Sequence, residues 1–222
     1  MIRREPSKTA FLSPAHARAF FLDHGFLRRL NNNNFHRISE RAFRSGQPLP
    51  GDLRKYVARH GIRTVVTLRG TKGSLPYIRL MEELCGELGV AFRNFPLNSR
   101  RPPRPERVRA ARDLLEEIEY PALFHCKSGA DRAGLFSALY LHFIEGVPME
   151  RTGQLRFWPY GHIRQASTGV LGRFVDAYAA HAREHGTPFL EWVEQVYDRE
   201  ALRAEAGAGG FNWVVDRLLR RE

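Results

Sequence analysis

The sequence predicts an α/β fold in which helices flank a central, mostly parallel β-sheet. Short apolar segments alternate with longer amphipathic segments between residues 36 and 146, and strands that alternate with helices are typical of parallel sheets. Gly and Pro residues separate many of these segments, as expected where one element ends and another begins. The length of 222 residues suits one medium-sized domain with terminal additions.

We expect three regions along the chain. Residues 1–35 are predicted to form an N-terminal helical arm, because apolar residues recur at helical spacing over 11–30 and Asn31–Asn34 then interrupt the pattern. Residues 36–185 form the main domain, and residues 186–222 form a C-terminal helical extension with a last helix at 211–221. Packing on the domain explains the apolar stripes of both terminal helices better than contact with an anionic membrane, the second interpretation.

Within the main domain, each predicted element follows from a local pattern. The spacing of apolar residues predicts helices and strands; the helices are 52–59, 77–88, 106–119 and 133–145, and the strands are 36–39, 42–45, 62–68, 90–97 and 121–125. Gly61 ends the first helix, and Gly146 with Pro148 ends the last. Beyond residue 150 we expect further helices, interrupted at 158–165 and 207–210.

A proline-rich segment at 98–105 separates the strand at 90–97 from the following helix. Its prolines lack backbone donors and restrict the residues before them, so we expect a stiff loop, which Arg100, Arg101 and Arg104 make cationic. Ligands of parallel sheets bind beyond the carboxyl ends of the strands. Because three predicted strands lead into Arg69, this loop and Cys126, we expect these three segments to line one crevice.

Composition narrows the class of protein. The chain carries 35 Lys and Arg against 24 Asp and Glu, a net charge of +11, which favours an anionic partner. No apolar run reaches the roughly 18 to 20 residues of a membrane-spanning helix, and the first residues lack a secretory pattern. Two cysteines, Cys85 and Cys126, cannot build a disulfide scaffold or a four-thiolate zinc site. These features predict a cytoplasmic protein.

The segment Leu123–Gly134 carries the chemistry. An apolar strand runs into Cys126, five residues follow, and Arg132 stands at the start of a helix. Such a loop can point its backbone N–H groups inward, next to the positive end of the helix, and so bind a phosphate. Gly129 permits a backbone conformation closed to most residues. The Arg132 guanidinium can donate to two phosphate oxygens, and the positive surroundings favour a Cys126 thiolate.

These residues predict a nucleophile at the floor of a phosphate site. In-line attack of Cys126 on phosphorus gives a thiophosphoryl intermediate, which water then hydrolyses. Arg132 and the loop amides would hold the equatorial oxygens during the transfer. The leaving alkoxide or phenoxide needs a proton, so an acid should lie near it.

The stretch His125–Gly134 resembles the signature loop of the cysteine-dependent protein tyrosine and dual-specificity phosphatases, in which a His-Cys pair precedes five residues and an Arg. Arg44–Pro48, Thr67–Gly70 and Tyr160–Ala166 resemble segments of the atypical dual-specificity phosphatases of bacteria. The resemblance covers residues 36–185 and marks them as the catalytic domain. It implies a compact dual-specificity-phosphatase-like fold, no metal or other cofactor, Cys126 as nucleophile and Arg132 as phosphate clamp.

Two positions depart from the pattern of that family. Its usual general acid is an Asp on a loop about 30 residues before the Cys, but no residue from 88 to 105 is acidic, and the nearest acid, Glu106, opens a helix. Asp131 is therefore the candidate acid; its position resembles the loop Asp of myotubularin-type and Sac-type phosphoinositide phosphatases. Ala133 stands where the family has a Ser or Thr that stabilises the departing thiolate, which bears on the hydrolysis of the intermediate.

Further residues are predicted to contact the substrate. They are Lys127, Ser128, Gly129, Ala130, Arg69, Arg100, His162, Arg164 and Gln165. The first four belong to the loop, the next two are cations that could hold further phosphates, and the resemblance places the last three over the pocket. A solvated basic rim and an ordinary helix connection are the alternatives. Cys85 is predicted to pack in the core rather than to act as a redox partner.

The sequence therefore predicts a cytoplasmic, metal-independent phosphomonoester hydrolase. An arginine-rich rim and an acid within the loop favour a phospholipid or inositol phosphate over phosphotyrosine in a phosphoprotein. Ala133 and the missing upstream acid support a second hypothesis, a catalytically weak phosphate-binding module. Nucleic acid is not an expected partner, because the chain lacks basic tracts with interleaved stacking aromatics.

Overall fold

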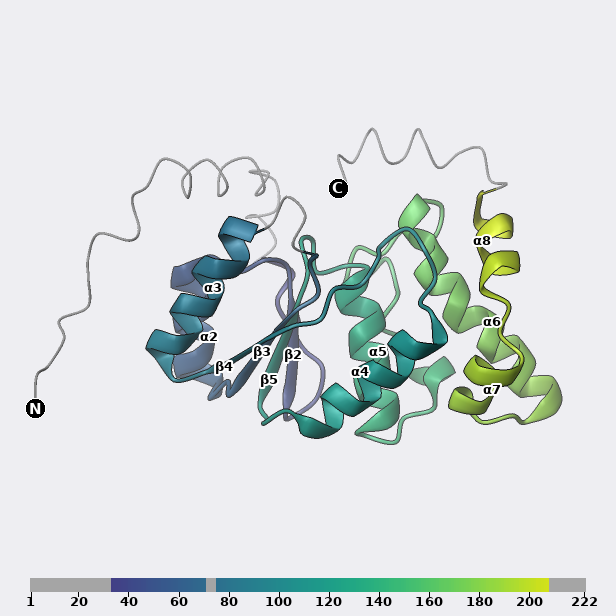
Figure 1. The fold of residues 1–222 in the computed structure, drawn as a ribbon, viewed down its shortest axis with the longest axis horizontal. Helices are drawn as coiled ribbons and strands as arrows, with labels where there is room; N and C mark the ends of the chain where they lie inside the picture. The colour runs from purple at the N-terminus through teal and green to yellow at the C-terminus, as the bar shows by residue number, and fades with distance from the viewer. Residues whose placement is uncertain (1–32, 71–74, 208–222) are drawn as a thin grey trace, which may run out of the picture.

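A computed structural model describes residues 33–70 and 75–207 (Figure 1). The helices expected at 11–30 and 211–221 lie outside these residues. Within them, no helix is long and apolar enough to cross a membrane. The cytoplasmic location stays a prediction.

A five-stranded sheet forms the centre of the molecule. Its strands are β1 (His36–Arg37), β2 (Ala42–Ser45), β3 (Thr64–Thr67), β4 (Ala91–Asn94) and β5 (Ala122–His125), in the order β1-β2-β5-β3-β4. β1 pairs antiparallel with β2, and all other neighbours are parallel. The predicted mostly parallel sheet is thus confirmed. Ser45 and Thr67 both pair with His125, so β2, β3 and β5 end at one edge.

Helices cover both faces of the sheet (Figure 1). On one face lie α2 (Pro50–His60) and α3 (Leu75–Leu88); on the other lie α4 (Pro105–Glu117), α5 (Arg132–Phe143), α6 (Val170–His185), α7 (Phe189–Gln195) and α8 (Arg199–Gly207). Two short 3-10 helices, η3 (Met149–Arg151) and η4 (Ser167–Gly169), lie between α5 and α6. Alternation along the strands explains the two layers: Phe43, Val65 and Leu123 join the cluster with α2 and α3, whereas Ala42, Val66 and Phe124 join the other.

The C-terminal helices belong to the larger of these two cores. Phe189 and Trp192 of α7 pack in the same buried cluster as Phe124 and Phe136. The boundary expected at 185/186 therefore falls between two helices that share a core.

Local chemistry accounts for where elements end. Gly61 takes a left-handed conformation, φ +64°, and its N–H donates to Val57 O after the last turn of α2. The strand expected at 90–97 covers only Ala91–Asn94. Pro96 has no N–H with which to continue the ladder.

Candidate active site

The loop between β5 and α5 turns back on its own cysteine. Cys126 directly follows β5, and Arg132 is the first residue of α5. The Gly129 N–H donates to Cys126 Sγ over 3.2 Å, and an amide donor at this position stabilises negative charge on sulfur. Gly129 has φ +76°, and a Cβ on it would lie 2.5 Å from Gly46 N. The turn therefore requires glycine for both its backbone angle and its space.

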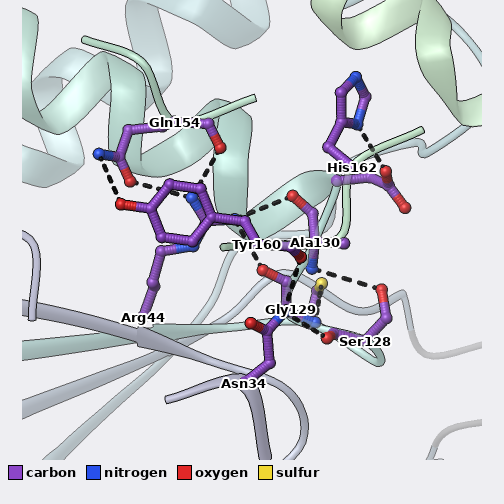
Figure 2. A network of polar contacts seen from close by, with 10 residues as sticks. Asn34, Arg44, Ser128, Gly129, Ala130, Gln154, Tyr160 and His162 are labelled. Carbon is purple, nitrogen blue, oxygen red and sulfur yellow. Dashed lines mark hydrogen bonds and ion pairs between the residues drawn. The ribbon is translucent and has the colours of Figure 1, made fainter. Parts of the chain in front are cut away.

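Arg44 of β2 is buried, and its guanidinium lies next to this loop and to the Tyr160 ring (Figure 2). Its Nη2 donates to Gly129 O over 2.7 Å and to Ala130 O over 2.9 Å. Its Nη1 donates to the backbone O of Gln154 over 2.7 Å and to Oε1 of the same residue over 2.9 Å. The guanidinium carbon lies 4.0 Å from the centre of the Tyr160 ring. Burial lowers the pKa of Arg44 to about 10, so the side chain is charged at neutral pH.

Arg44 orients two amide groups of the loop. The C=O and N–H of a trans peptide unit point in opposite directions. Because the Gly129 and Ala130 carbonyls face Arg44, the N–H groups of Ala130 and Asp131, which belong to the same peptide units, face away from it. The Ala130 N–H accordingly meets Ser128 Oγ at 3.4 Å. A charged side chain thus fixes the backbone that is predicted to hold phosphate.

Asn34 ties two further segments to the loop. Its Nδ2 donates to Ser128 O over 3.0 Å and to Tyr160 O over 2.9 Å (Figure 2). Its Oδ1 lies 2.8 Å from His36 Nε2, and the His36 ring meets the Tyr160 ring edge-on at 5.0 Å. The packed unit therefore begins before residue 36, where the domain boundary was expected.

Asp131 and His162 form a buried pair beside the loop. His162 Nδ1 lies 2.7 Å from Asp131 Oδ1, and the two side chains are 0% and 3% exposed. Gly172 of α6 makes room for the imidazole, since a Cβ there would lie 2.8 Å from His162 Nε2. The carboxyl group of Asp131 is therefore in hydrogen-bond contact with a second group that can carry a proton.

The other predicted site residues lie in the loop, just after β3 and on the surface. Arg132 is buried at the start of α5, and Lys127 and Ser128 are half-buried within the loop. Arg69 is buried, and its Nη1 donates to Gln47 Oε1. Arg100 is exposed, and its backbone N–H donates to Asn98 Oδ1 over 2.8 Å.

The segment before α6 does not place all its predicted residues at the loop. Arg164 and Gln165 are exposed, and Arg164 pairs with Asp176 of α6. Only His162 of the three is bonded to a loop residue. Glu106, the other candidate acid, is exposed in the first turn of α4.

Burial shifts the pKa values of two predicted residues, Cys85 and His125. Burial raises the pKa of the Cys85 thiol to about 12, and Cys85 packs with Met81 and Leu84 in the core, as predicted. Burial lowers the pKa of His125 to about 3. The imidazole of His125 is therefore neutral at neutral pH.

Sequence reasoning gave no role to Arg44, Asn34, Gln154 or Tyr160. Arg44 entered only as part of a segment that resembles the phosphatases. The signal available in the sequence was a charged residue within the strand predicted at 42–45. The structure buries all four residues of this strand, and a buried charge needs several hydrogen-bond partners.

A match to a family model identifies the family of this chain. A model described as "DSP-PTPase phosphatase fused to NAD+ Kinase" matches residues 27–161. The chain belongs to this phosphatase family. Among curated proteins of related sequence, the dual specificity protein phosphatase TpbA of Pseudomonas aeruginosa is 31% identical over 127 residues, which cover 51% of this chain and 58% of TpbA. The chain thus matches little more than half the length of this relative.

Solved structures share the fold of this family member. A TpbA variant in complex with phosphotyrosine has a TM-score of 0.53 at 19% identity, covering 81% of this chain and 93% of that one. Tk-PTP in its active form has a TM-score of 0.52 at 19% identity, covering 65% and 97%. At these identities the likeness establishes the dual-specificity-phosphatase-like fold.

Proposed function

We propose that the protein is a cysteine-dependent phosphomonoester hydrolase, with Cys126 as nucleophile and Arg132 as phosphate clamp. The observation that carries this proposal is the loop geometry, in which the Gly129 N–H meets Cys126 Sγ at 3.2 Å. Membership of a phosphatase family, matched over residues 27–161, supports it. Arg132 follows the loop at the helix N-terminus, where positive potential favours an anion.

In the first step, the Cys126 thiolate attacks phosphorus and the bond from phosphorus to the ester oxygen breaks. The leaving oxygen takes a proton, which yields a neutral alcohol or phenol. Arg132 and the loop amides hold the equatorial oxygens through the transfer. Arg44 supports this step from behind, because it fixes the Gly129 and Ala130 carbonyls.

In the second step, water attacks the thiophosphoryl group and the bond between sulfur and phosphorus breaks. The group that donated its proton in the first step takes one from the water, so that inorganic phosphate leaves and the thiolate returns. Ala133 offers no hydroxyl to the departing sulfur. We expect this step to limit turnover.

We assign the acid role to Asp131. Its carboxyl group is buried, 2.7 Å from His162 Nδ1, so the imidazole can hold it in place and exchange a proton with it. Glu106 is the alternative, but it is exposed in α4 and would have to move to the loop.

The substrate we propose is a phosphomonoester with more than one negative charge, such as an inositol phosphate or a phospholipid headgroup. The exposed Arg100 and the net charge of +11 support this choice. Phosphotyrosine is the competing substrate, and the TpbA complex with phosphotyrosine supports it. A panel of phosphopeptides, inositol phosphates and phospholipids, compared by kcat/KM, separates the two.

An aryl phosphate assay tests the proposed hydrolysis. We expect the purified chain to release phenol with and without EDTA, and Cys126→Ser to abolish the release. Acid quenching during turnover should trap a phosphorylated cysteine in the wild type. Equal rates for the wild type and Cys126→Ser would falsify the proposal.

A weak phosphate-binding module is the second candidate function, and Ala133 is the observation that favours it. The aryl phosphate assay distinguishes the binding module from the hydrolase. A binding module would bind inorganic phosphate in wild type and yet release no phenol beyond a single turnover. Ala133→Ser should then raise turnover if hydrolysis of the intermediate is the slow step.

A further inference from the structure

A second concave site is lined by residues outside the cysteine loop. A cavity of about 250 Å³ is bounded by the segment between β4 and α4, by α5 and by α8; its walls include Asn98, Arg101, Arg104, Arg107, Leu135 and Arg199. In Figure 1 the segment after β4 crosses in front of α5 before it enters α4. No residue of 126–134 lines this cavity. We call it the arginine pocket.

The walls of the arginine pocket are held by bonds to proline carbonyls. Arg107 donates through Nε and Nη2 to Pro96 O, over 3.1 and 2.9 Å. Arg199 Nε donates to Pro102 O over 3.0 Å, and Tyr197 Oη donates to Pro103 O over 3.1 Å. The prolines restrict the backbone further, so the pocket is formed before any ligand enters it.

The arginines of this pocket are poorly balanced by carboxylates. Arg199 pairs with Glu200 over 2.6 Å. Arg107 instead lies over the Phe95 ring, 3.6 Å from its centre. Arg101 and Arg104 are exposed, and within residues 33–70 and 75–207 neither forms an ion pair.

Several other surface arginines of the molecule face acidic side chains. Arg54 lies 2.9 Å from Glu87, and Arg63 lies 2.6 Å from Glu119. Arg101 and Arg104 differ from these arginines, because the described residues give them no carboxylate partner, and both line one cavity. Like charges gathered around one cavity repel each other, and an anion in the cavity would relieve that repulsion.

We propose that the arginine pocket binds a phosphate group of a polyphosphorylated small molecule, at a site separate from the cysteine loop. Guanidinium groups present paired donors that match phosphate oxygens. Leu135 adds an apolar wall, which suits the carbon skeleton that carries the phosphate. This binding does not depend on the proposed hydrolysis.

Two sources can supply that phosphate. It is either a second phosphate of the substrate held at Cys126 or a phosphate of a separate ligand. Leu135 lies one helical turn after Arg132 in α5, so the two sites share a helix.

Binding of inositol hexakisphosphate and of pyrophosphate by the full chain tests the pocket. The measurement is calorimetric titration in the Cys126→Ser background, which prevents turnover. We expect the double change Arg101→Ala and Arg104→Ala to weaken binding of both probes about tenfold or more, since charge-assisted hydrogen bonds are lost. Because both side chains are exposed and form no ion pair within residues 33–70 and 75–207, the thermal midpoint should stay unchanged.

The matched control is Arg59→Ala with Arg79→Ala, which removes the same charge from exposed positions in α2 and α3 on the other face of the sheet. We expect this control to change binding by less than about twofold, the size of a screened surface effect. Equal losses in the two double variants, no loss in either, or no binding of the probes to the parent would each overturn the proposal.

A kinetic comparison in the active chain identifies the source of the phosphate, and this part rests on the proposed function. If the substrate spans both sites, the pocket variant raises KM for inositol hexakisphosphate and leaves KM for a simple aryl phosphate unchanged. If a separate ligand binds, both KM values stay unchanged while the loss of pyrophosphate binding persists. Failure of hydrolysis in every variant would count against the proposed function and leave the titration result intact.

Discussion

Arg44 places a permanent positive charge behind the backbone of the cysteine loop. It is buried and bonds four oxygens, those of Gly129, Ala130 and two of Gln154. Hydrogen bonds to a charged group contribute about 1.5 to 3 kcal/mol each, and removal of one partner leaves the other buried and unsatisfied. Arg44 is therefore a positioning residue whose effect should reach the phosphate site.

We predict that Arg44→Met lowers kcat/KM for an aryl phosphate by about 100-fold and raises the inhibition constant of inorganic phosphate, because two carbonyls lose their partner. Arg44→Lys keeps the charge but lacks the planar fork, and we expect it to recover part of the loss. Both variants are compared with the wild type at a temperature where melting curves show them folded. A folded Arg44→Met with unchanged phosphate affinity would contradict this role.

Asp131 offers a second prediction at this scale. Loss of a general acid costs about 10² to 10⁴ in rate when the leaving group needs a proton and far less when it does not. We expect Asp131→Asn to slow hydrolysis of an alkyl phosphate at least 100-fold and that of a nitrophenyl phosphate by a few fold. Glu106→Gln is the matched control. A leaving-group effect in Glu106→Gln and none in Asp131→Asn would move the acid role to α4.

At the scale of the element, the loop packs directly against the end of strand β2, which leaves room for a glycine at position 129 but not for a Cβ. Ser45 and Gly46 approach Gly129 so closely that a Cβ there would lie 2.7 Å from Ser45 C and 2.5 Å from Gly46 N. The loop between β5 and α5 is thus shaped by a strand from an earlier part of the chain.

We predict that Gly129→Ala displaces the loop, because alanine at φ +76° is strained by about 1 to 3 kcal/mol even before the contact with β2. The expected result is loss of most activity together with a lower free energy of unfolding, measured by urea titration. Gly146→Ala is the matched control, since Gly146 also has positive φ but its added Cβ meets no atom within 4 Å. It should lose stability and keep kcat. Normal activity in Gly129→Ala would show that the loop does not need this turn.

The elements themselves were largely predictable from the sequence, because each depends on local pattern. The helices and strands lie where apolar spacing placed them, and the cysteine loop was recognised from adjacent residues. Arg44 was not predictable in its role, because its contacts depend on the pairing of β2 with β5, which joins Arg44 to a loop 85 residues away. The exposed Arg164 could not be foreseen either, since its orientation depends on Asp176 of α6.

At the scale of the whole molecule, the helices after residue 185 support the same core as the sheet. Trp192 of α7 is 4% exposed and packs in the cluster that contains Phe124. Removing a buried aromatic side chain costs about 3 to 5 kcal/mol. We predict this loss for Trp192→Ala in urea unfolding, and a change within about 0.5 kcal/mol for Trp158→Ala, whose side chain is 82% exposed. Equal stability of the two variants would show that α7 contributes little to the core.

The stability of the whole molecule should also depend on acid through His125. Its folded-state pKa of about 3 lies below the ordinary value of 6.5 because of burial, so between these values the unfolded chain binds the extra proton. The free energy of unfolding should therefore fall as pH drops below 6.5, by about 1.4 kcal/mol per pH unit at the steepest. Urea titrations at several pH values check this. His125→Gln should flatten the dependence, and an identical slope in that variant would assign it to other groups.

The placement of Arg44 on β2 links occupancy of the loop to assembly of the sheet. An oxyanion bound to the loop favours the state in which β2 is paired with β5. The stability of this strand pair should therefore rise as the anion site fills. Each tenfold excess of such an ion over its dissociation constant should add about 1.4 kcal/mol to the reversible unfolding free energy. A thermal-shift titration with vanadate or tungstate thus reports on the anion site above the sulfur without any turnover.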